Sequence, residues 1–269
     1  MGCLLLAWIK ITRPLNGIIA GFGVLLGAIC LHIPVFISPI IFCFLAMSLL
    51  AMAGNVHNDI CDLEIDKINQ PHRPLSSGKV SIIGAWFLTI ALLGYSLAFA
   101  FLAGPLQFMA TVLMAILLYL YNRYFKSWPL IGNFSVSLLC ALAILFPGLG
   151  LAAFPLPMWG AVIFAFVFTL VREIIKDLED QEGDRALGLK TFAILCPSPW
   201  NYLTPYFLWV ILACSLPLSF IFEVYTKTFL VSSSIFVLLP SVVVFFKFFI
   251  PKTITITIAT KPSVPILQS

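Results

Sequence analysis

Charge is scarce in this chain. Asp, Glu, Lys and Arg make up only 10% of its 269 residues, and 61% of the residues are hydrophobic. A soluble globular domain carries about 25% charged residues. The composition therefore excludes an ordinary soluble domain and predicts one all-α domain that crosses a membrane several times.

Sequence patterns that indicate common metal sites or disulfide networks are also missing. The seven cysteines are scattered and include no Cys-x2-Cys pair, so the sequence indicates neither a zinc site nor a disulfide network. The Asp-x-Asp-x-Asp-Gly pattern of a calcium-binding loop is absent as well. No convincing signal-peptide cleavage site follows the first apolar residues, and residues 1–11 are expected to form a short helix at the membrane surface.

Long apolar runs dominate the chain instead. A helix needs about 20 residues to cross a hydrocarbon core of about 30 Å. We predict eight transmembrane helices, at residues 15–33, 35–56, 80–103, 106–121, 130–154, 158–175, 202–222 and 229–250. They form a single predicted domain over residues 1–250. In the atypical tail, 251–269, alternating Thr and Ile residues predict an extended or disordered segment.

The acidic residues gather in two short segments. Ten of the eleven lie within residues 59–66 and 173–184. Both segments contain the spacing Asp-x2-Asp-x3-Asp: the first motif is Asp59, Asp62 and Asp66, and the second motif is Asp177, Asp180 and Asp184. Because residues i, i+3 and i+7 share one face of a helix, each motif is predicted to form a stripe of three carboxylates.

Three like charges on one helix face in an apolar chain require compensation. Either protons neutralise some carboxylates through raised pKa values, or divalent cations bind them. Mg²⁺ prefers hard oxygen ligands and commonly bridges carboxylates to substrate phosphates. The two motifs therefore predict a site for Mg²⁺ and a diphosphate. Solvated loop charges and the ion path of a cation transporter are the alternative interpretations.

Basic residues accompany both motifs and predict an orientation. Fourteen of the fifteen Lys and Arg residues fall on one side of the predicted spans, which the positive-inside rule assigns to the cytoplasm. Both motifs then face the cytoplasm. Arg73 lies in a turn rich in proline, glycine and serine that directly follows the first motif, and its guanidinium is suited to binding a phosphate bidentately.

The motifs and their flanking residues resemble those of the UbiA-type intramembrane prenyltransferases. The first motif stands in the run N-D-x2-D-x3-D at residues 58–66, and I-N-x-P-x-R-P-L-x-S-G follows at residues 68–78. The second motif is followed by G-L-K-T at residues 188–191. The order, the spacing and the placement on one side agree over about residues 10–250.

This resemblance implies a bundle of transmembrane helices around a central cavity that opens laterally to the lipid. The aspartates would bind Mg²⁺ and the diphosphate of an isoprenyl donor. Ionisation of the donor would yield an allylic carbocation that an acceptor nucleophile captures. Members of the family generally have nine spans, so the eight predicted here imply a ninth helix that is missing or degenerate.

Within the family, residues 172–184, with Lys176 four residues before Asp180, look most like digeranylgeranylglyceryl phosphate synthases. Those enzymes join a second geranylgeranyl chain to geranylgeranylglyceryl phosphate, which makes an archaeal-type ether lipid. Parts of the same stretch also resemble homogentisate prenyltransferases and chlorophyll synthases. A prenyltransferase that acts on an aromatic or tetrapyrrole acceptor, such as homogentisate, hydroxybenzoate or chlorophyllide, is therefore the alternative.

The motifs and the resemblance together give a set of candidate site residues. The residues expected to act in catalysis are Asp62, Asp66, Asp180 and Asp184. The expected Mg²⁺ ligands are Asn58, Asp59, Asp62, Asp66, Asp177, Asp180 and Asp184. The expected contacts to diphosphate or substrate are Asn55, Arg73, Lys79, Tyr121, Arg123, Lys126, Arg172, Lys176 and Lys190. The expected partners are geranylgeranyl diphosphate, a phosphorylated glycerol ether and the lipid bilayer, with no nucleic acid.

Overall fold

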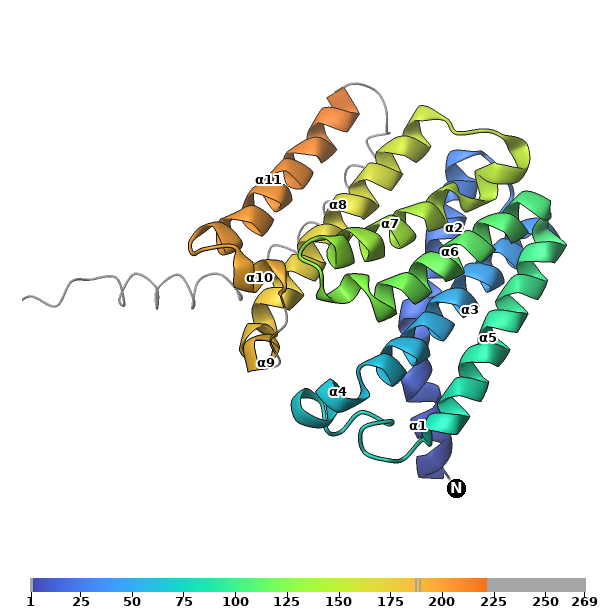
Figure 1. The fold of residues 1–269 in the computed structure, drawn as a ribbon. Helices are drawn as coiled ribbons and strands as arrows, with labels where there is room; N and C mark the ends of the chain where they lie inside the picture. Colours follow the sequence, from blue (N-terminus) through green and yellow to red (C-terminus); the bar gives the residue numbers. More distant parts are fainter. Residues whose placement is uncertain (1, 187, 189, 222–269) are drawn as a thin grey trace, which may run out of the picture. The chain divides into compact units, whose positions relative to one another are not determined.

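A computed structural model describes residues 2–186, 188 and 190–221, and in this part of the chain helices alternate with short turns and no strand occurs (Figure 1). The helices are α1 Gly2–Thr12, α2 Pro14–Cys30, α3 Ser38–Cys61, α4 Leu63–Asn69, α5 Ile82–Ala103, α6 Pro105–Arg123, η1 Phe125–Ser127, α7 Ile131–Leu145, η2 Phe146–Leu151, α8 Leu156–Glu179, α9 Gln181–Ala186, α10 Phe192–Leu195 and α11 Trp200–Ile221. Residues 1–212 form one compact unit, and the second unit, 213–269, is described only as far as the end of α11.

Helices occupy seven of the eight predicted transmembrane positions, and the eighth, 229–250, lies outside the described residues together with the tail at 251–269. Five helices of the described chain are long and apolar enough to cross a membrane: α3, α5, α6, α7 with η2, and α8. The pair α1 and α2, bent by 41° at its junction, makes a sixth if it acts as one span. The described part of the protein is therefore all-helical, with the apolar spans of a membrane protein, and the count of eight spans stays a prediction.

Local sequence accounts for where several of these helices begin. Pro14 and Pro105 stand at the first positions of α2 and α6, where the missing N–H of proline costs no hydrogen bond. The hydroxyl of Ser81 accepts a hydrogen bond from the backbone N–H of Gly84 at 3.1 Å and so caps the start of α5. These helix starts lie between the apolar runs of the sequence, and they determine which residues stand at the ends of the helices.

The centre of the bundle is α3, which packs against α2, α5 and α6, while α7 packs against α8 and also contacts α2. The main buried cluster joins side chains of α2, α3, α5, α6, α7 and η2: Val24, Cys43, Ala46, Met47, Leu50, Ala100, Met114, Ala143 and Phe146. The helices approach closely at Gly27, where an added Cβ would lie 2.0 Å from the carbonyl oxygen of Ile144. Small residues at such crossings are typical of helix packing in membranes.

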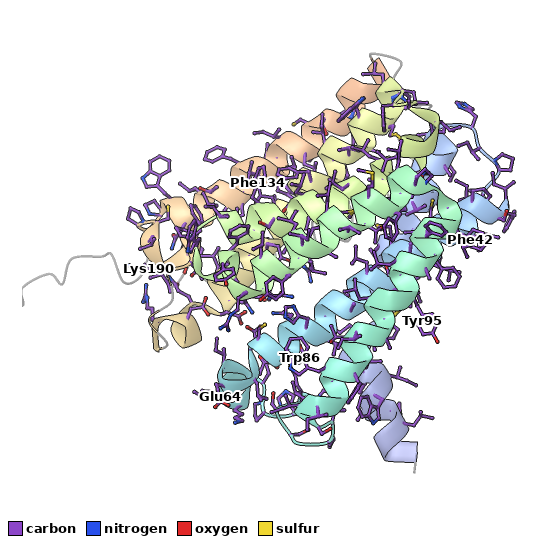
Figure 2. All side chains as sticks on the ribbon, turned by 45° about the vertical axis from the view of Figure 1, so that its right-hand side comes forward. Phe42, Glu64, Trp86, Tyr95, Phe134 and Lys190 are labelled. Carbon is purple, nitrogen blue, oxygen red and sulfur yellow. The ribbon has the colours of Figure 1, made fainter. Side chains whose placement is uncertain are left out.

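The outer surface of the bundle is apolar. Ile83, Phe87 and Ile90 form an exposed stripe along α5 at helical spacing. Aromatic side chains also project outward, among them Tyr95 and Phe134 (Figure 2). Large apolar side chains over the outside of a bundle are the arrangement that a lipid environment stabilises.

Candidate active site

The two acidic motifs have the same backbone conformation. In each, a long helix ends just before the middle aspartate, Asp62 after α3 and Asp180 after α8, and a short helix follows at once. Their φ and ψ angles are −93° and 5° for Asp62 and −86° and 1° for Asp180. The prediction of an unbroken helical stripe was therefore wrong at the middle residue. The third aspartate of each motif, Asp66 or Asp184, therefore lies on the short helix that follows.

Helical hydrogen bonds nevertheless continue through both breaks. The N–H of Asp62 donates to the carbonyl of Asn58 at 2.9 Å, and the N–H of Asp66 donates to the carbonyl of Asp62 at 2.8 Å. In the second motif the N–H groups of Asp180 and Asp184 make the equivalent bonds, both at 3.0 Å. The repeated spacing in the sequence thus specifies a repeated local structure.

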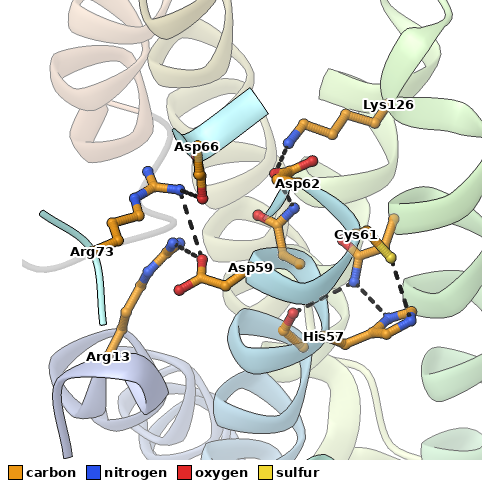
Figure 3. A network of polar contacts seen from close by, with 11 residues as sticks. Arg13, His57, Asp59, Cys61, Asp62, Asp66, Arg73 and Lys126 are labelled. Atoms are coloured by element: carbon orange, nitrogen blue, oxygen red, sulfur yellow. Dashed lines mark hydrogen bonds and ion pairs between the residues drawn. The ribbon is translucent and has the colours of Figure 1, made fainter. Parts of the chain in front are cut away.

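The first motif is buried and paired with arginines. Its three aspartates, Asp59, Asp62 and Asp66, are 2%, 6% and 5% exposed. Arg73 Nη1 lies 2.5 Å from Asp66 Oδ2 and 3.7 Å from Asp59 Oδ1, and Arg13 also forms an ion pair with Asp59 (Figure 3). Burying a carboxylate is costly unless it is paired or hydrogen-bonded, so these arginines compensate the burial of Asp59 and Asp66.

Asp62 has a different set of partners. The amide Nδ2 of Asn58 donates to Asp62 Oδ2 at 2.7 Å, and the ammonium of Lys126 donates to the same oxygen (Figure 3). Lys126 belongs to η1, just beyond the end of α6. The predicted residues Asn58, Asp62 and Lys126 are therefore in direct contact, although they come from two distant segments of the chain.

Arg13 is held in an unusual backbone conformation. Its φ of 48° and ψ of 64° lie in the left-handed region, at the junction between α1 and α2. Non-glycine residues seldom adopt this region. Two contacts fix the junction to α3: the ion pair of Arg13 with Asp59, and a hydrogen bond at 3.2 Å from Asn55 Nδ2 to the carbonyl of Thr12. Asn55 was predicted to contact substrate, and in the structure its side chain stabilises the bend between α1 and α2.

The turn that carries Arg73 is ordered by an apolar cluster of its own. Leu75 and Val80 of the turn are buried with Ile11 of α1 and Val56 of α3. Backbone bonds close the turn, among them one from the N–H of Val80 to the carbonyl of Pro74 at 3.1 Å. The prediction of an ordered turn after the first motif is confirmed, and its packing accounts for the position of Arg73.

The second motif has fewer partners. Asn133, at the start of α7, donates through Nδ2 to Asp177 Oδ2 at 2.8 Å. Glu173, one turn earlier on α8, is buried and forms an ion pair with the exposed Arg172. No lysine or arginine in the described part of the chain forms an ion pair with any of the three aspartates of this motif.

The surroundings of Asp184 change the pKa of its carboxyl group. Burial raises the pKa of Asp184, and the neighbouring Asp180 carboxylate raises it further. The hydroxyl of Thr191 and the charges of Lys126 and Lys176 act on this pKa in the opposite direction. Since Lys126 also pairs with Asp62, its ammonium lies within electrostatic reach of both motifs.

Tyr121 also lies between the motifs. The charges of Asp62, Glu173 and Asp177 all act on its phenol. Tyr121 is on the last turn of α6, close in sequence to Lys126. The ends of α3, α6 and α8 and the start of α7 therefore meet at one end of the bundle, and this is where both motifs lie.

His57, which stands next to the first motif in the sequence, is part of the packing. Its Nδ1 lies 3.0 Å from Asn122 Nδ2, and its Nε2 lies 3.5 Å from Cys61 Sγ. The ring is stacked on Tyr119 and packs against Trp86. These contacts join α3 to α5 and α6 and occupy both ring nitrogens, so His57 supports the helix that carries the motif.

Other predicted residues lie at the edge of this region. The exposed candidates are Lys79, Arg123, Arg172 and Lys190, whereas Lys176 is half-buried. Sequence reasoning missed the contacts of Arg13 and Asn133. No spacing rule connects either residue with an aspartate far away in the chain.

The donor groups suit Mg²⁺. Both motifs contain carboxylate oxygens, which are hard ligands, and the carboxylate of Asp62 already binds a cation, the ammonium of Lys126. Among the described residues, no three His, Cys, Asp or Glu side chains converge as ready metal ligands. The aspartates would therefore hold Mg²⁺ after their side chains exchange partners.

Comparison with known proteins identifies the family. The model of the UbiA prenyltransferase family matches residues 17–254. The chain belongs to the UbiA prenyltransferase family. It is 37% identical over 243 residues to the digeranylgeranylglyceryl phosphate synthase of Methanobrevibacter smithii, covering 86% of this chain and 84% of that protein. It is 36% identical over 192 residues to the synthase of the same name from Methanopyrus kandleri, covering 70% and 69%.

Solved structures of UbiA proteins have the same fold. A structure of digeranylgeranylglyceryl phosphate synthase superposes with a TM-score of 0.67 at 29% identity, covering 86% of this chain and 83% of that one. A UbiA homologue from Archaeoglobus fulgidus bound to GPP and Mg²⁺ superposes with a TM-score of 0.69 at 21% identity, covering 89% and 86%. The protein is thus a membrane prenyltransferase with the UbiA fold.

Proposed function

We propose that this UbiA protein is a digeranylgeranylglyceryl phosphate synthase. It transfers a geranylgeranyl group from geranylgeranyl diphosphate to geranylgeranylglyceryl phosphate, in the synthesis of an archaeal-type ether lipid. The observation that carries this proposal is the similarity over most of the chain to synthases of that name, in a protein that keeps both aspartate motifs. The acceptor carries a phosphate of its own, which suits the basic residues beside the second motif.

The bond changes balance in a simple way. The C1–O bond of the donor breaks, and the diphosphate leaves with the electron pair. The glycerol hydroxyl oxygen of the acceptor forms the new C–O bond to C1, and its proton passes to the released diphosphate. The product is an ether with two geranylgeranyl chains, and the by-product is diphosphate.

The residues around the motifs have distinct roles in this proposal. The aspartates of both motifs, with Asn58, would hold Mg²⁺, which neutralises charge on the leaving diphosphate. Arg73 and Lys126 lie at the first motif and would bind diphosphate oxygens. Lys176 and Arg172, at the second motif, would bind the acceptor phosphate. Tyr121, between the motifs, would lie beside the reacting carbon, where an aromatic face favours positive charge.

The exposed basic residues would lie where the substrates enter the site. Lys79, Arg123 and Lys190 would attract the two phosphorylated substrates to this end of the bundle. The placement of fourteen of the fifteen basic residues on one side supports a cytoplasmic orientation for this end, in the cell membrane. The long apolar chains would then lie within the bilayer, in a cavity between the helices that opens to lipid.

A single assay tests the proposal. Purified protein in lipid nanodiscs is given geranylgeranyl diphosphate with geranylgeranylglyceryl phosphate, and in parallel with homogentisate or 4-hydroxybenzoate. We expect Mg²⁺-dependent diphosphate release and a doubly prenylated glycerol phosphate, identified by mass spectrometry. Product from an aromatic acceptor alone would contradict the assignment of the acceptor, and no product from any acceptor would contradict the enzyme activity.

A further inference from the structure

Each aspartate of the first motif is bound by a cation that comes from another part of the chain (Figure 3). We call these three cations, Arg13, Arg73 and Lys126, the clamp. Each carboxylate of the motif thus has a protein cation in contact with it. A divalent metal that enters this motif must therefore compete with protein cations that already occupy its ligands.

The second motif has no such clamp. In the described chain its aspartates make no ion pair, and Asp177 is held by the neutral amide of Asn133. A metal that binds here gains attraction from carboxylates that form no ion pair with a described residue, and it displaces none of the three cations of the clamp. The two motifs thus differ in how readily they accept a metal.

Lys126 is the member of the clamp best placed to move. It lies on a three-residue turn between α6 and α7, it is one-third exposed, and a single ammonium on a four-carbon stem makes its contact. Lys126 is bonded to Asp62 of the first motif, and its turn packs against α7, whose Asn133 binds Asp177 of the second motif. A rotation of this side chain can therefore transfer the charge from one carboxylate toward a ligand between the motifs.

We propose that Lys126 is an exchange residue, which occupies the metal position on Asp62 until substrate arrives and then turns to the diphosphate. This inference rests on the proposed function, because it assumes a metal and a diphosphate at this site. Metal binds first at the second motif. Metal binding at the first motif and diphosphate binding then strengthen each other, since the diphosphate removes Lys126 from Asp62.

The proposed exchange predicts that removing the charge of Lys126 strengthens metal binding. Lys126→Gln removes the competitor, so Mn²⁺, used as a probe for Mg²⁺, should bind the substrate-free protein about fivefold more tightly. The same variant should bind the diphosphate more weakly, and added metal should tighten its diphosphate binding less than in the unmodified protein. A lysine that only contacts diphosphate would leave Mn²⁺ affinity unchanged, and a lysine that only supports the fold would lower both affinities.

Substrate-free Mn²⁺ binding to the purified full chain can be measured from the electron paramagnetic resonance of free Mn²⁺. Lys67→Gln is the matched control, because Lys67 makes an ion pair with the exposed Glu64 within α4 and contacts none of the three aspartates. We expect no change in Mn²⁺ affinity for Lys67→Gln. In an Asp62→Asn background the gain from Lys126→Gln should disappear, because the carboxylate for which metal and lysine compete is gone. Unchanged or weaker Mn²⁺ binding in folded Lys126→Gln would overturn the proposal.

A second measurement keeps the proposal testable if Lys126→Gln does not fold. Asp62→Asn alone releases Lys126, so geranylgeranyl thiodiphosphate, an analogue that ionises slowly, should bind about fivefold more tightly in the presence of EDTA. Equal or weaker binding of the analogue by Asp62→Asn would contradict the exchange. Neither result depends on which acceptor the enzyme uses, so a failure of the acceptor assay and a failure of the exchange are distinguishable.

Discussion

The first and second motifs have the same aspartate spacing and the same break at the middle residue, yet they are neutralised in different ways. The first is paired with Arg13, Arg73 and Lys126, which come from three separate segments. The second is held by an amide of α7 and by charges that act from a distance. Spacing along the chain therefore determines the local backbone, and the surrounding helices determine how each carboxylate is compensated.

The largest expected effect comes from removing the middle aspartate of either motif. Asp62→Ala and Asp180→Ala should each lower the rate of prenyl transfer at least about 100-fold, because each removes charge stabilisation of the leaving diphosphate. Tight Mn²⁺ binding by the substrate-free protein should be lost in Asp180→Ala and kept in Asp62→Ala. Assays of product formation and Mn²⁺ binding check this, and near-normal rates in both variants would contradict a metal role for the motifs.

Arginines at the two motifs should differ in their effect on stability. Arg73→Ala leaves two buried carboxylates with weaker pairing, and we expect the free energy of unfolding to fall by about 2 kcal/mol. Arg172→Ala removes a mostly exposed partner of Glu173, and we expect a loss below about 1 kcal/mol. Denaturant unfolding in detergent measures both. An equal loss would mean that the pairing at the first motif is no stronger than that at Glu173.

The two amides that bind the aspartates offer a finer comparison. Asn58→Ala and Asn133→Ala each remove a hydrogen bond to a carboxylate, which contributes about 1.5 kcal/mol. We expect the larger fall in the free energy of unfolding from Asn133→Ala, because Asp177 has no ion pair with a described residue, whereas Asp62 keeps Lys126 when no substrate is bound. Denaturant unfolding of the two variants without substrate measures the difference. A larger effect at Asn58 would reverse this ranking of the two motifs.

The smallest effect is expected on the outer side of α4. The ion pair between Lys67 and Glu64 is 51% and 81% exposed on its two side chains. Lys67→Gln should change the free energy of unfolding by less than about 0.5 kcal/mol, because water and salt screen such a pair. Thermal unfolding in detergent is a sufficient measurement. A change comparable with that of Arg73→Ala would show that α4 itself, rather than the clamp, supports the first motif.

Much of the architecture could be predicted from the sequence. Apolar runs predicted the positions of seven helices that the structure describes, and the turn after the first motif was recognised from its prolines and glycine. These features depend on neighbours in the chain, and local sequence is sufficient to specify them.

The break at Asp62 and Asp180 could not be predicted from spacing. Hydrogen bonds at helical separation run through both residues, so the break lies in the backbone angles of one residue, which periodicity does not reveal. The role of Arg13 was hidden for a different reason. Its position before Pro14 indicates a helix start, but nothing in that segment connects it with Asp59, which follows it by 46 positions.

By itself, the sequence determined that this protein is a helical membrane protein, that it carries two equal acidic motifs, and that these motifs suit a metal and a diphosphate. Composition and spacing are local properties, and they are sufficient for those conclusions. Only the tertiary structure decided that the first motif is neutralised by three cations from elsewhere in the chain and that the second has no ion pair among the described residues. The physical reason is that ion pairing depends on distance in space, which the packing of α1, α3, α6 and α8 sets.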